Sequence, residues 1–483
     1  MDRNEFVEWA HEVVDWMAWY YDHIEEFPVR SRVAPGDIMR QLPVAAPEQG
    51  EAFDEILADF KEIILPGMTH WQHPKFFAYF PANSSYPSVL AEMLTAALAA
   101  QGMIWQTSPS ATELEERIMG WLRDLIGLPR QFEGVIQDTA STSTLVALLT
   151  AREVKTGFRS NEEGLSGLPA MTVYASEQTH SSIEKDVKIA GFGRANYRPL
   201  PVDESFAMKP AELEAAIIRD EEAGLTPCCV VATIGTTGST AIDPLRDIVE
   251  IAGRHALWVH VDAALAGSAL VLPEHRSMID GIDGVDSFVF NPHKWLFTNF
   301  DCSAYFVRDK AALLRTFEIH PEYLKTAEGA TVNNYRDWGI QLGRRFRSLK
   351  LWFVLRSFGA ERIRAIIGEH IRLAGDLASR IDAEPDFERL APTPLNTVCF
   401  HYVPRGGAPG GGGAGARGSD LDTVNALNRR ILDAVNESGK AYITHTTLNG
   451  VYTLRFVVGQ TNTTERHVNE AWELITETAR ALG

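Results

Sequence analysis

The 483-residue sequence contains little cysteine, and the positions of its four cysteines exclude the usual zinc and disulfide patterns. They are Cys228, Cys229, Cys302 and Cys399, and none forms a Cys-x-x-Cys pair. A zinc site therefore has little support, and we expect no metal. A disulfide between the neighbours Cys228 and Cys229 would be strained. We interpret all four as buried thiols of a protein in a reducing compartment.

The sequence also lacks long apolar runs. No stretch of 18 consecutive apolar residues occurs, so we expect neither a membrane span nor a membrane partner. The first residues, Met1-Asp2-Arg3-Asn4-Glu5, lead directly into an amphipathic pattern without the layout of a signal peptide. These observations together predict a cytoplasmic protein.

Positive charge is scarce relative to negative charge. Lys and Arg number 45 and Asp and Glu number 64, which gives a net charge of −19. Such a surface repels nucleic acid and anionic membranes, so we expect no nucleic-acid partner. Any anionic ligand must be held by a local site. The apolar share of 45% and the chain length are ordinary for a globular protein of two or three domains.

The pattern of apolar residues predicts three segments. Residues 1–85 begin with helical spacing over 4–26, whose wide apolar face needs either the protein's own core or a second subunit. Residues 86–375 alternate amphipathic stretches with short apolar runs, which indicates an α/β domain with a mostly parallel sheet. Residues 376–483 read as a smaller α+β domain.

The elements of this last domain are predicted in more detail. We expect a strand over 397–403, helices over 421–437 and 463–482, and a hairpin around Asn449-Gly450. The stretch 405–418 is dominated by glycine and predicts a flexible surface loop. It lacks the Lys-Ser/Thr pair that would open a helix after a phosphate-binding loop.

Four apolar runs in the central segment, each expected to be a strand, lead to polar side chains. In chain order, 171–175 leads to His180, 228–234 to Gly235-Thr236-Thr237, 257–261 to Asp262, and 287–290 to His293 and Lys294. Ligands of open α/β sheets bind beyond the carboxyl ends of the strands, so these groups should gather at one edge. Taken singly, these groups have ordinary explanations: a structural His, an Asp in a turn or helix cap, and a solvated Lys.

The conjunction of these groups matches what pyridoxal 5'-phosphate (PLP) requires. An aldehyde cofactor needs an amine with which to form a Schiff base. Its protonated pyridine nitrogen needs a carboxylate, and its ring needs a flat partner such as imidazole. Its phosphate needs donors, and the hydroxyl-rich turn Thr139–Ser143 opens a predicted helix whose N-terminus favours an anion. Simple N-capping is the alternative interpretation of that turn.

The segments around these residues resemble the group II PLP-dependent decarboxylases, most closely the aromatic L-amino-acid decarboxylases. Asn291-Pro292-His293-Lys294-Trp295, followed by Asn299–Ser303, is similar to their lysine motif. His260–Ala264 resembles their pyridinium-binding motif, and His180-Ser181-Ser182 their ring-stacking segment. Further similar segments are 80–84, 108–115 and 342–350.

The resemblance implies an α/β fold of the PLP-dependent transferase type (fold type I) and a homodimer with active sites at the subunit interface. It assigns Lys294 as the Schiff-base lysine, Asp262 as the pyridinium partner, His180 as the ring-stacking residue and Tyr323 as a proton donor. The full cofactor set that it implies is Ala140, Ser141, His180, Thr237, Asp262, Ala264, Asn291, His293 and Lys294. The substrate set is Trp71, Tyr79, Phe80, Pro81, Ala82, Gln101 and Met103.

Tyr323 decides between two activities of this family. In the family it lies in a mobile loop and protonates the carbanion left by carbon dioxide, whereas relatives with Phe there tend to act as aldehyde synthases. The resemblance therefore implies decarboxylation of an aromatic L-amino acid. The alternatives are an aldehyde synthase, a group II decarboxylase for a non-aromatic amino acid, another PLP enzyme such as an aminotransferase, and an inactive dimeric scaffold. Four residues differ from those that are usual in the family: Ala82, Gln101, Met103 and Leu265. These differences bear on which substrate the protein prefers.

Overall fold

The computed structural model describes residues 1–319, 331–404 and 419–483. The described chain divides into two compact units. Unit 1 comprises Met1–Pro81, Leu377–Leu390 and Phe400–Gly483, and unit 2 comprises Ala82–Asp376 and Ala391–Cys399. The division into three functional segments with borders at 85 and 375 stays a prediction.

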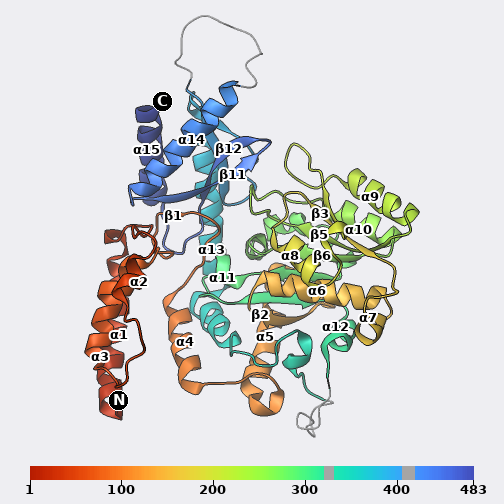
Figure 1. Ribbon diagram of the computed structural model, residues 1–483, viewed down its shortest axis with the longest axis horizontal. Helices are drawn as coiled ribbons and strands as arrows, with labels where there is room; N and C mark the ends of the chain where they lie inside the picture. The colour runs from red at the N-terminus through yellow and green to blue at the C-terminus, as the bar shows by residue number, and fades with distance from the viewer. Residues whose placement is uncertain (320–330, 405–418) are drawn as a thin grey trace, which may run out of the picture. The chain divides into compact units, whose positions relative to one another are not determined.

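A seven-stranded sheet forms the centre of unit 2 (Figure 1). Its strands, in spatial order, are β2 (Glu133–Gln137), β8 (Ser303–Val307), β7 (Ser287–Phe290), β6 (Trp258–Asp262), β5 (Thr226–Thr233), β3 (Met171–Ser176) and β4 (Tyr197–Leu200). The five strands from β7 to β4 run parallel, and β8 is antiparallel to both of its neighbours. The mostly parallel sheet is confirmed, as are the four predicted strands, with ends that shift by at most two residues.

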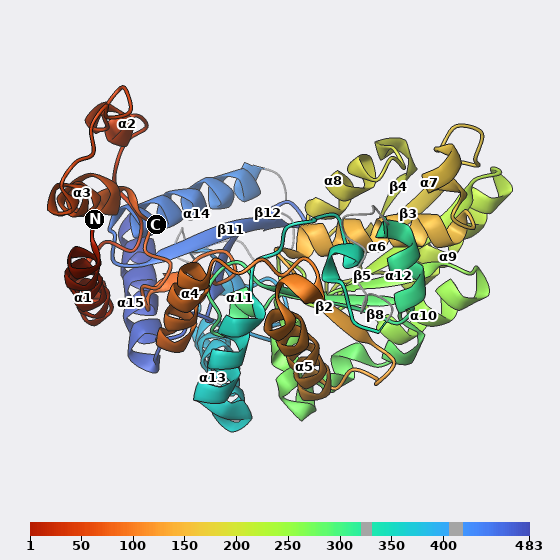
Figure 2. The ribbon, with the colours of Figure 1, turned by 90° about the horizontal axis from the view of Figure 1, so that it is seen from below.

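Helices cover both faces of this sheet. Helix α6 (Ala140–Lys155) packs over β5, β6 and β7, and Figure 2 shows α10 (Leu245–Arg254) on the opposite face. The other helices of unit 2 include α4 (Tyr86–Leu98), α5 (Pro109–Ile126), α7 (Arg159–Glu163), α8 (Ser182–Ile189), α9 (Pro210–Glu222), α11 (Pro292–Trp295) and α12 (Lys310–Phe317). Helix α13 (Ser348–Ala383) is interrupted at Gly359, where φ is 70°, and carries the chain from unit 2 into unit 1.

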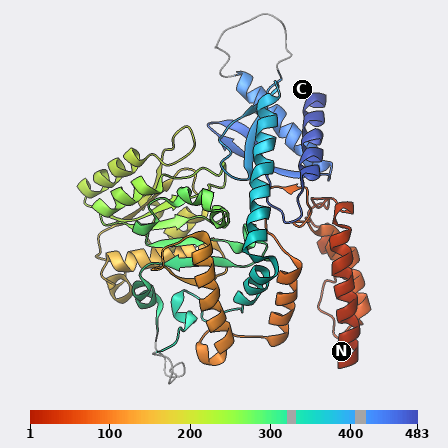
Figure 3. The same ribbon diagram turned by 180° about the vertical axis from the view of Figure 1, so that it is seen from behind.

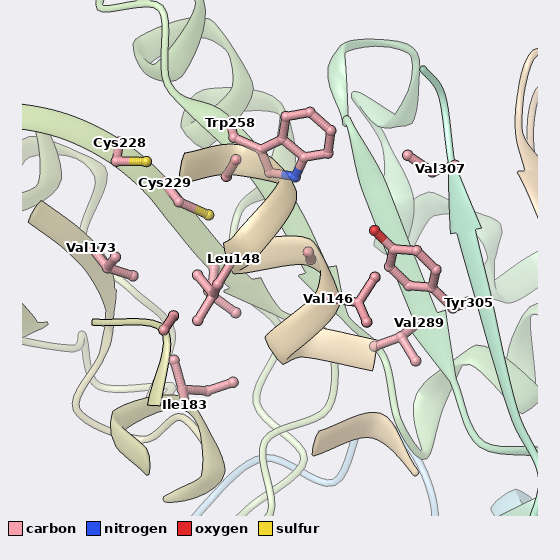
Figure 4. Close-up of a cluster of buried hydrophobic side chains, with 14 of the residues drawn as sticks. Val146, Leu148, Val173, Ile183, Cys228, Cys229, Trp258, Val289, Tyr305 and Val307 are labelled. Atoms are coloured by element: carbon pink, nitrogen blue, oxygen red, sulfur yellow. The ribbon is translucent and has the colours of Figure 1, made fainter. Parts of the chain in front are cut away.

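The core of unit 2 lies between α6 and the sheet. Figure 4 shows side chains from α6, α8 and five strands gathered there, among them Leu148, Cys229 and Trp258. All four cysteines are buried free thiols, as predicted. Burial raises the pKa of the Cys228 thiol to about 12, so this thiol stays protonated and unreactive.

Unit 1 contains the N-terminal helices and the chain after α13. Its helices include α1 (Arg3–Asp22), α2 (Asp37–Gln41), α3 (Phe53–Asp59), α14 (Ser419–Glu437) and α15 (Glu465–Leu482), and the last two lie side by side (Figure 3). The five-stranded sheet has the order β1 (Phe76–Phe77), β11 (Tyr442–Leu448), β12 (Val451–Val457), β10 (Thr397–Tyr402) and β9 (Phe387–Arg389). The strand and the two helices predicted for this region are confirmed.

The predicted hairpin joins β11 to β12. Asn449 and Gly450 have φ values of 50° and 81°, the left-handed pair that a two-residue type I′ turn requires. The predicted glycine-rich loop, 405–418, lies outside the described residues. Among the described residues, no helix is both long enough and apolar enough to cross a bilayer.

Candidate active site

Lys294 lies on the short helix α11, just beyond the carboxyl end of β7. Asn291 precedes this helix, and the Lys294 N–H donates to the Asn291 carbonyl over 2.9 Å. The Lys294 carbonyl in turn accepts a bond of 2.8 Å from the Asn83 side-chain amide, and the Asn83 N–H donates to the His293 carbonyl over 3.1 Å. Asn83 therefore holds the backbone that presents the half-buried Lys294 side chain.

Asp262 ends the neighbouring strand β6 and is 5% exposed. Its Oδ1 accepts the Ala264 N–H over 3.0 Å, and the Ala264 carbonyl accepts the Asn291 N–H over 2.9 Å. Hydrogen bonds thus join the turn after β6 to the residue that begins the lysine helix. This arrangement fixes a carboxylate and an amine at the same edge of the sheet.

His180 comes from the segment after β3 and reaches the same edge. Its neighbour Thr179 contacts Thr233 through their hydroxyls at 2.9 Å, and Thr233 pairs with Asp262 between β5 and β6. The His180 Nδ1 accepts the Ser182 N–H over 3.2 Å, which leaves the proton of the neutral ring on Nε2.

The charges of Asp262 and Lys294 both act on the His180 imidazole. Partial burial lowers the pKa of the imidazole, the Asp262 carboxylate opposes this, and Lys294 lowers the pKa further. Because burial and the lysine prevail, the ring is neutral at physiological pH. A neutral imidazole can lie flat against an aromatic cofactor ring without adding a charge to it.

The start of α6 contains the residues predicted to bind the phosphate. Ala140 and Ser141 form its first turn, and the Thr139 side chain caps it by accepting the Thr142 N–H over 3.4 Å. The N-terminus of this 16-residue helix favours a negative group. The side-chain oxygen of Asn291 is buried and makes no hydrogen bond within the described residues, so it can accept a hydrogen bond from a donor of a ligand.

These residues fit PLP. The aldehyde of PLP needs an amine, its pyridine nitrogen a carboxylate, its ring a flat partner and its phosphate hydrogen-bond donors. The structure supplies an amine, a buried carboxylate, a neutral imidazole and the N-terminus of α6. Within residues 1–319, 331–404 and 419–483, no group of three or more His, Cys, Asp or Glu is placed to hold a metal ion.

Three further residues of the predicted cofactor set occupy different environments. Ala264 is half-buried beside Asp262, and Thr237 is exposed in the turn after β5. His293 is 3% exposed, and its Nδ1 accepts the Cys302 N–H over 2.8 Å. Burial lowers the pKa of His293 to about 3. Its ring therefore stays neutral and orders the turn between α11 and β8.

The predicted substrate residues belong to both units. In unit 1, the Trp71 and Tyr79 rings stack with centroids 5.9 Å apart, and the Arg455 guanidinium lies 4.7 Å from the centre of the Phe80 ring. Pro81 ends the first stretch of this unit and is buried. These contacts give the segment before Ala82 a defined aromatic surface.

The other three predicted substrate residues lie in unit 2. Ala82 is half-buried. Gln101 uses its side-chain oxygen to accept the Arg344 N–H over 2.7 Å, and the Met103 carbonyl accepts the Arg336 N–H over 3.0 Å. The segment with Gln101 and Met103 is therefore held by the chain that follows the predicted Tyr323 loop. Tyr323 itself lies outside the described residues.

Asp186, a buried carboxyl that the sequence did not single out, lies on α8 close enough to Asp262 to interact with it. It is 3% exposed, and its Oδ2 makes no hydrogen bond within the described residues. Burial raises the pKa of Asp186 to about 7, with Asp262 adding to the effect and Lys185 opposing it. A lone buried acid in a helix has no sequence signature, because its environment comes from long-range packing.

The raised pKa of Asp186 predicts a pH-dependent cost to stability. Between about pH 4 and pH 7 the unfolded chain loses this proton while the folded protein keeps it, so stability falls over this window. In the cofactor-free protein, Asp186→Asn should remove a cost of up to about 4 kcal/mol at pH 8 and have little effect near pH 4. Thermal unfolding measured across this pH range checks it.

Asp220→Asn is the matched control, because Asp220 is also buried but pairs with Arg198 at 2.8 Å. Losing that pair should destabilise the protein at pH 8, the opposite sign to Asp186→Asn. Equal destabilisation by both substitutions at pH 8 would contradict the assigned state of Asp186.

The fold and the site together define a PLP enzyme of fold type I, an α/β protein whose lysine, aspartate and histidine meet at the carboxyl edge of a mostly parallel sheet. The model of the pyridoxal-dependent decarboxylase conserved domain matches residues 35–403. The chain belongs to this family, and it is a PLP-dependent amino-acid decarboxylase.

Relatives of known activity match along the whole chain. The chain is 44% identical to a phenylacetaldehyde synthase of Arabidopsis thaliana and 43% identical to tyrosine decarboxylase 2 of Narcissus pseudonarcissus. Both matches cover 100% of this chain, with 97% and 95% of the relatives covered. The crystal structure of Oryza sativa TDC with PLP and tryptamine matches with a TM-score of 0.94 at 37% identity, covering 100% of this chain and 99% of that one.

Proposed function

We propose that this protein converts an aromatic L-amino acid to the corresponding amine and carbon dioxide, as a homodimer in the cytoplasm. The observation that carries the proposal is the meeting of Lys294, Asp262 and a neutral His180 at one sheet edge. The aromatic substrate class is supported by relatives named for tyrosine and phenylacetaldehyde, and by the tryptamine in the similar structure.

Different residues of the chain have different roles in binding the cofactor. PLP, when bound, supplies an aldehyde carbon for the covalent link to Lys294 and a ring that accepts electrons as carbon dioxide leaves. The Asp262 carboxylate would stabilise a proton on the pyridine nitrogen, and the neutral His180 imidazole would lie against the ring. The N-terminus of α6 would hold the phosphate, together with the N–H2 group of the Asn291 amide as a donor.

Two residues move protons and release the product. The substrate's amino group would take the place of Lys294 in the covalent link to the cofactor, and Lys294 would later re-form this link and release the amine product. Tyr323 donates a proton to the substrate Cα after carbon dioxide has left. The segments with Asn83 and Gln101 orient the reacting groups, because their hydrogen bonds fix the backbone around the lysine and the predicted pocket.

The substrate class is tested by carbon dioxide release from a panel of amino acids. The PLP-loaded protein is given Trp, Tyr, Phe or 3,4-dihydroxyphenylalanine, with Glu and His as non-aromatic controls. We expect kcat/KM for the best aromatic substrate to exceed that of either control by at least about 100-fold, because an aromatic pocket discriminates by burial of the ring. A preference for Glu or His would overturn the aromatic assignment.

The second proposed function is an aldehyde synthase, which decarboxylates and oxidatively deaminates. It is favoured by the 44% identity to a phenylacetaldehyde synthase over the whole chain. Tyr323 favours the amine product instead, as the family resemblance implies. The two functions differ in products, since only the synthase consumes oxygen and releases ammonia and hydrogen peroxide.

Unit 2 has an exposed apolar surface that could form the interface of the proposed homodimer. Helix α4 exposes an apolar stripe at helical spacing, which comprises Tyr86, Leu90, Met93, Leu94 and Leu98. Leu94 is 49% exposed and Leu98 is 65% exposed, values that an isolated protein seldom shows for a whole helix face. We propose that a second copy of the chain covers this stripe, and that residues 1–85 add to the dimer contact.

The dimer proposal predicts that Leu94→Glu weakens association. A twofold interface would receive the new charge from both copies, so burying it costs several kcal/mol. Sedimentation equilibrium should show monomers at concentrations where the wild type is dimeric. The control Ile218→Glu changes a residue on α9 that is 42% exposed, and this variant should stay dimeric. A fully dimeric Leu94→Glu protein would place the interface elsewhere.

A further inference from the structure

A fully buried imidazole lies directly behind Asp262 on β6. Side chains alternate between the two faces of a strand, so Trp258, His260 and Asp262 share one face. His260 contacts Thr144 of α6, which shows that this face is the one covered by α6. His260 therefore lies between the carboxylate that ends the strand and the helix that carries the residues predicted to bind the phosphate.

The His260 ring bridges helix and sheet through two hydroxyls. Its Nε2 is 3.1 Å from the Thr144 Oγ1, and its Nδ1 is 2.9 Å from the Oγ of Ser287, its cross-strand neighbour on β7. Ser287 also accepts the Trp258 indole N–H over 2.9 Å. A neutral imidazole offers one donor and one acceptor, and a hydroxyl can match either. Both ring nitrogens are thus satisfied without water.

The bridge is rigid and uncharged. His260 and Ser287 are 0% exposed and Thr144 is 1% exposed, so the three side chains are locked by packing. Burial lowers the pKa of His260 to about 4, although Asp262 opposes the effect. The ring therefore adds no positive charge behind Asp262. The negative charge of this carboxylate can then be balanced by a positive group of the bound ligand.

We propose that His260 is a positioning residue that sets the spacing between the pyridine end and the phosphate end of the cofactor site. His260 is two residues from Asp262 along the strand, about 7 Å. Thr144 is four residues from Ala140 along α6, about 6 Å. The bridge thus ties the two binding groups together through short rigid paths. The proposal rests on the assignment of Asp262 and Ala140 under the proposed function.

The spacing matters because the ring of PLP is rigid and a short linker joins it to the phosphate, which limits the distance between the pyridine nitrogen and the phosphate. If the binding groups can shift by about an ångström, ordering them on binding costs free energy and weakens the affinity for such a ligand. Removing the bridge should therefore weaken PLP binding and change the environment of the ring, even though His260 touches neither end of the cofactor. Loss of an outer support of this kind typically lowers the affinity of a preorganised site about 10-fold or more.

The experiment titrates the cofactor-free dimer with PLP and follows the visible absorption band of the lysine-bound cofactor. His260→Leu removes both hydrogen bonds, His260→Gln keeps a group that can reach Thr144, and Thr144→Val removes one partner at nearly constant shape. We expect the dissociation constant of PLP to rise about 10-fold for Thr144→Val and further for His260→Leu, with His260→Gln between wild type and Leu. We also expect the pH dependence of the absorption band to shift.

Tyr174→Phe is the matched control for loss of a buried hydrogen bond in the same sheet. The Tyr174 hydroxyl on β3 is buried and donates to Asp220 over 2.7 Å. Its neighbours Val173 and Ala175 belong to the core under α6, so the Tyr174 side chain lies on the other face of the sheet from the His260 bridge. It should lower the thermal stability while leaving PLP affinity and the absorption band unchanged. Should His260→Leu fail to fold, Thr144→Val decides the matter.

Two outcomes overturn the proposal in distinguishable ways. If Thr144→Val and His260→Gln bind PLP as tightly as wild type and only lose stability, as Tyr174→Phe does, His260 is a structural residue. If Asp262→Asn also retains wild-type affinity and the wild-type band, then the assignment of the site itself is wrong. Weaker PLP binding in the bridge variants, with an unchanged control, supports the positioning role.

Discussion

Lys294→Ala should abolish decarboxylation and remove the visible absorption of the PLP-loaded protein. The lysine is the amine that the α11 turn presents beside Asp262 and His180, so no other described group in that cluster can replace its covalent role. We expect kcat/KM to fall by at least about 10³-fold, because the variant loses both the link to the cofactor and the group that releases the product. Rates of carbon dioxide release and absorption spectra measure the two effects.

Lys310→Ala is the control for this substitution. Lys310 lies on α12 in the same unit, and its ion pair with Glu133 is remote from the sheet edge that carries the site. Its loss should leave turnover and spectrum near wild-type values. Full turnover by Lys294→Ala, with an intact band, would mean that the lysine assignment is wrong.

Tyr323→Phe should change the product more than the rate of carbon dioxide release. The tyrosine is proposed to protonate the substrate Cα, and removing a positioned acid slows such a transfer by about 10²-fold or more. Amine formation should fall by this factor, while carbon dioxide release continues and ammonia, hydrogen peroxide and the aldehyde appear. Product analysis in air-saturated buffer checks the prediction.

Tyr174→Phe serves as the control for a lost phenol, since the Tyr174 hydroxyl is buried on β3 and donates to Asp220. It should keep the wild-type ratio of amine to carbon dioxide. If Tyr323→Phe still gives amine alone at the wild-type rate, another group delivers the proton. The role of Tyr323 and the preference for amine over aldehyde would then both need revision.

Local patterns were sufficient to predict most of the fold. The four strands that lead into the site are short apolar runs. Strands buried on both faces of a sheet have nearly continuous apolar sequences, so they can be predicted from the sequence. The hairpin around Asn449-Gly450 was predictable because few residues accept two successive left-handed conformations. The start of α6 was predictable because Thr139 caps it through its side chain.

The contacts that hold the site could not be read from local patterns. Asn83 supports Lys294 across 211 positions of sequence, and His260 joins Thr144 across 116 positions. Asp186 has a raised pKa only because α8 buries it near Asp262. Each of these environments depends on how separate elements pack, and a single polar residue in a strand or helix does not reveal its long-range partner.

The most direct test of the central claim is the stoichiometry of the wild-type reaction. The PLP-loaded protein is given its best aromatic L-amino acid in air-saturated buffer without any keto acid, and carbon dioxide, amine and hydrogen peroxide are counted. The account predicts one amine for each carbon dioxide and no peroxide. Peroxide and ammonia equal to the carbon dioxide would identify an aldehyde synthase, and conversion that requires a keto acid and releases no carbon dioxide would contradict decarboxylation altogether.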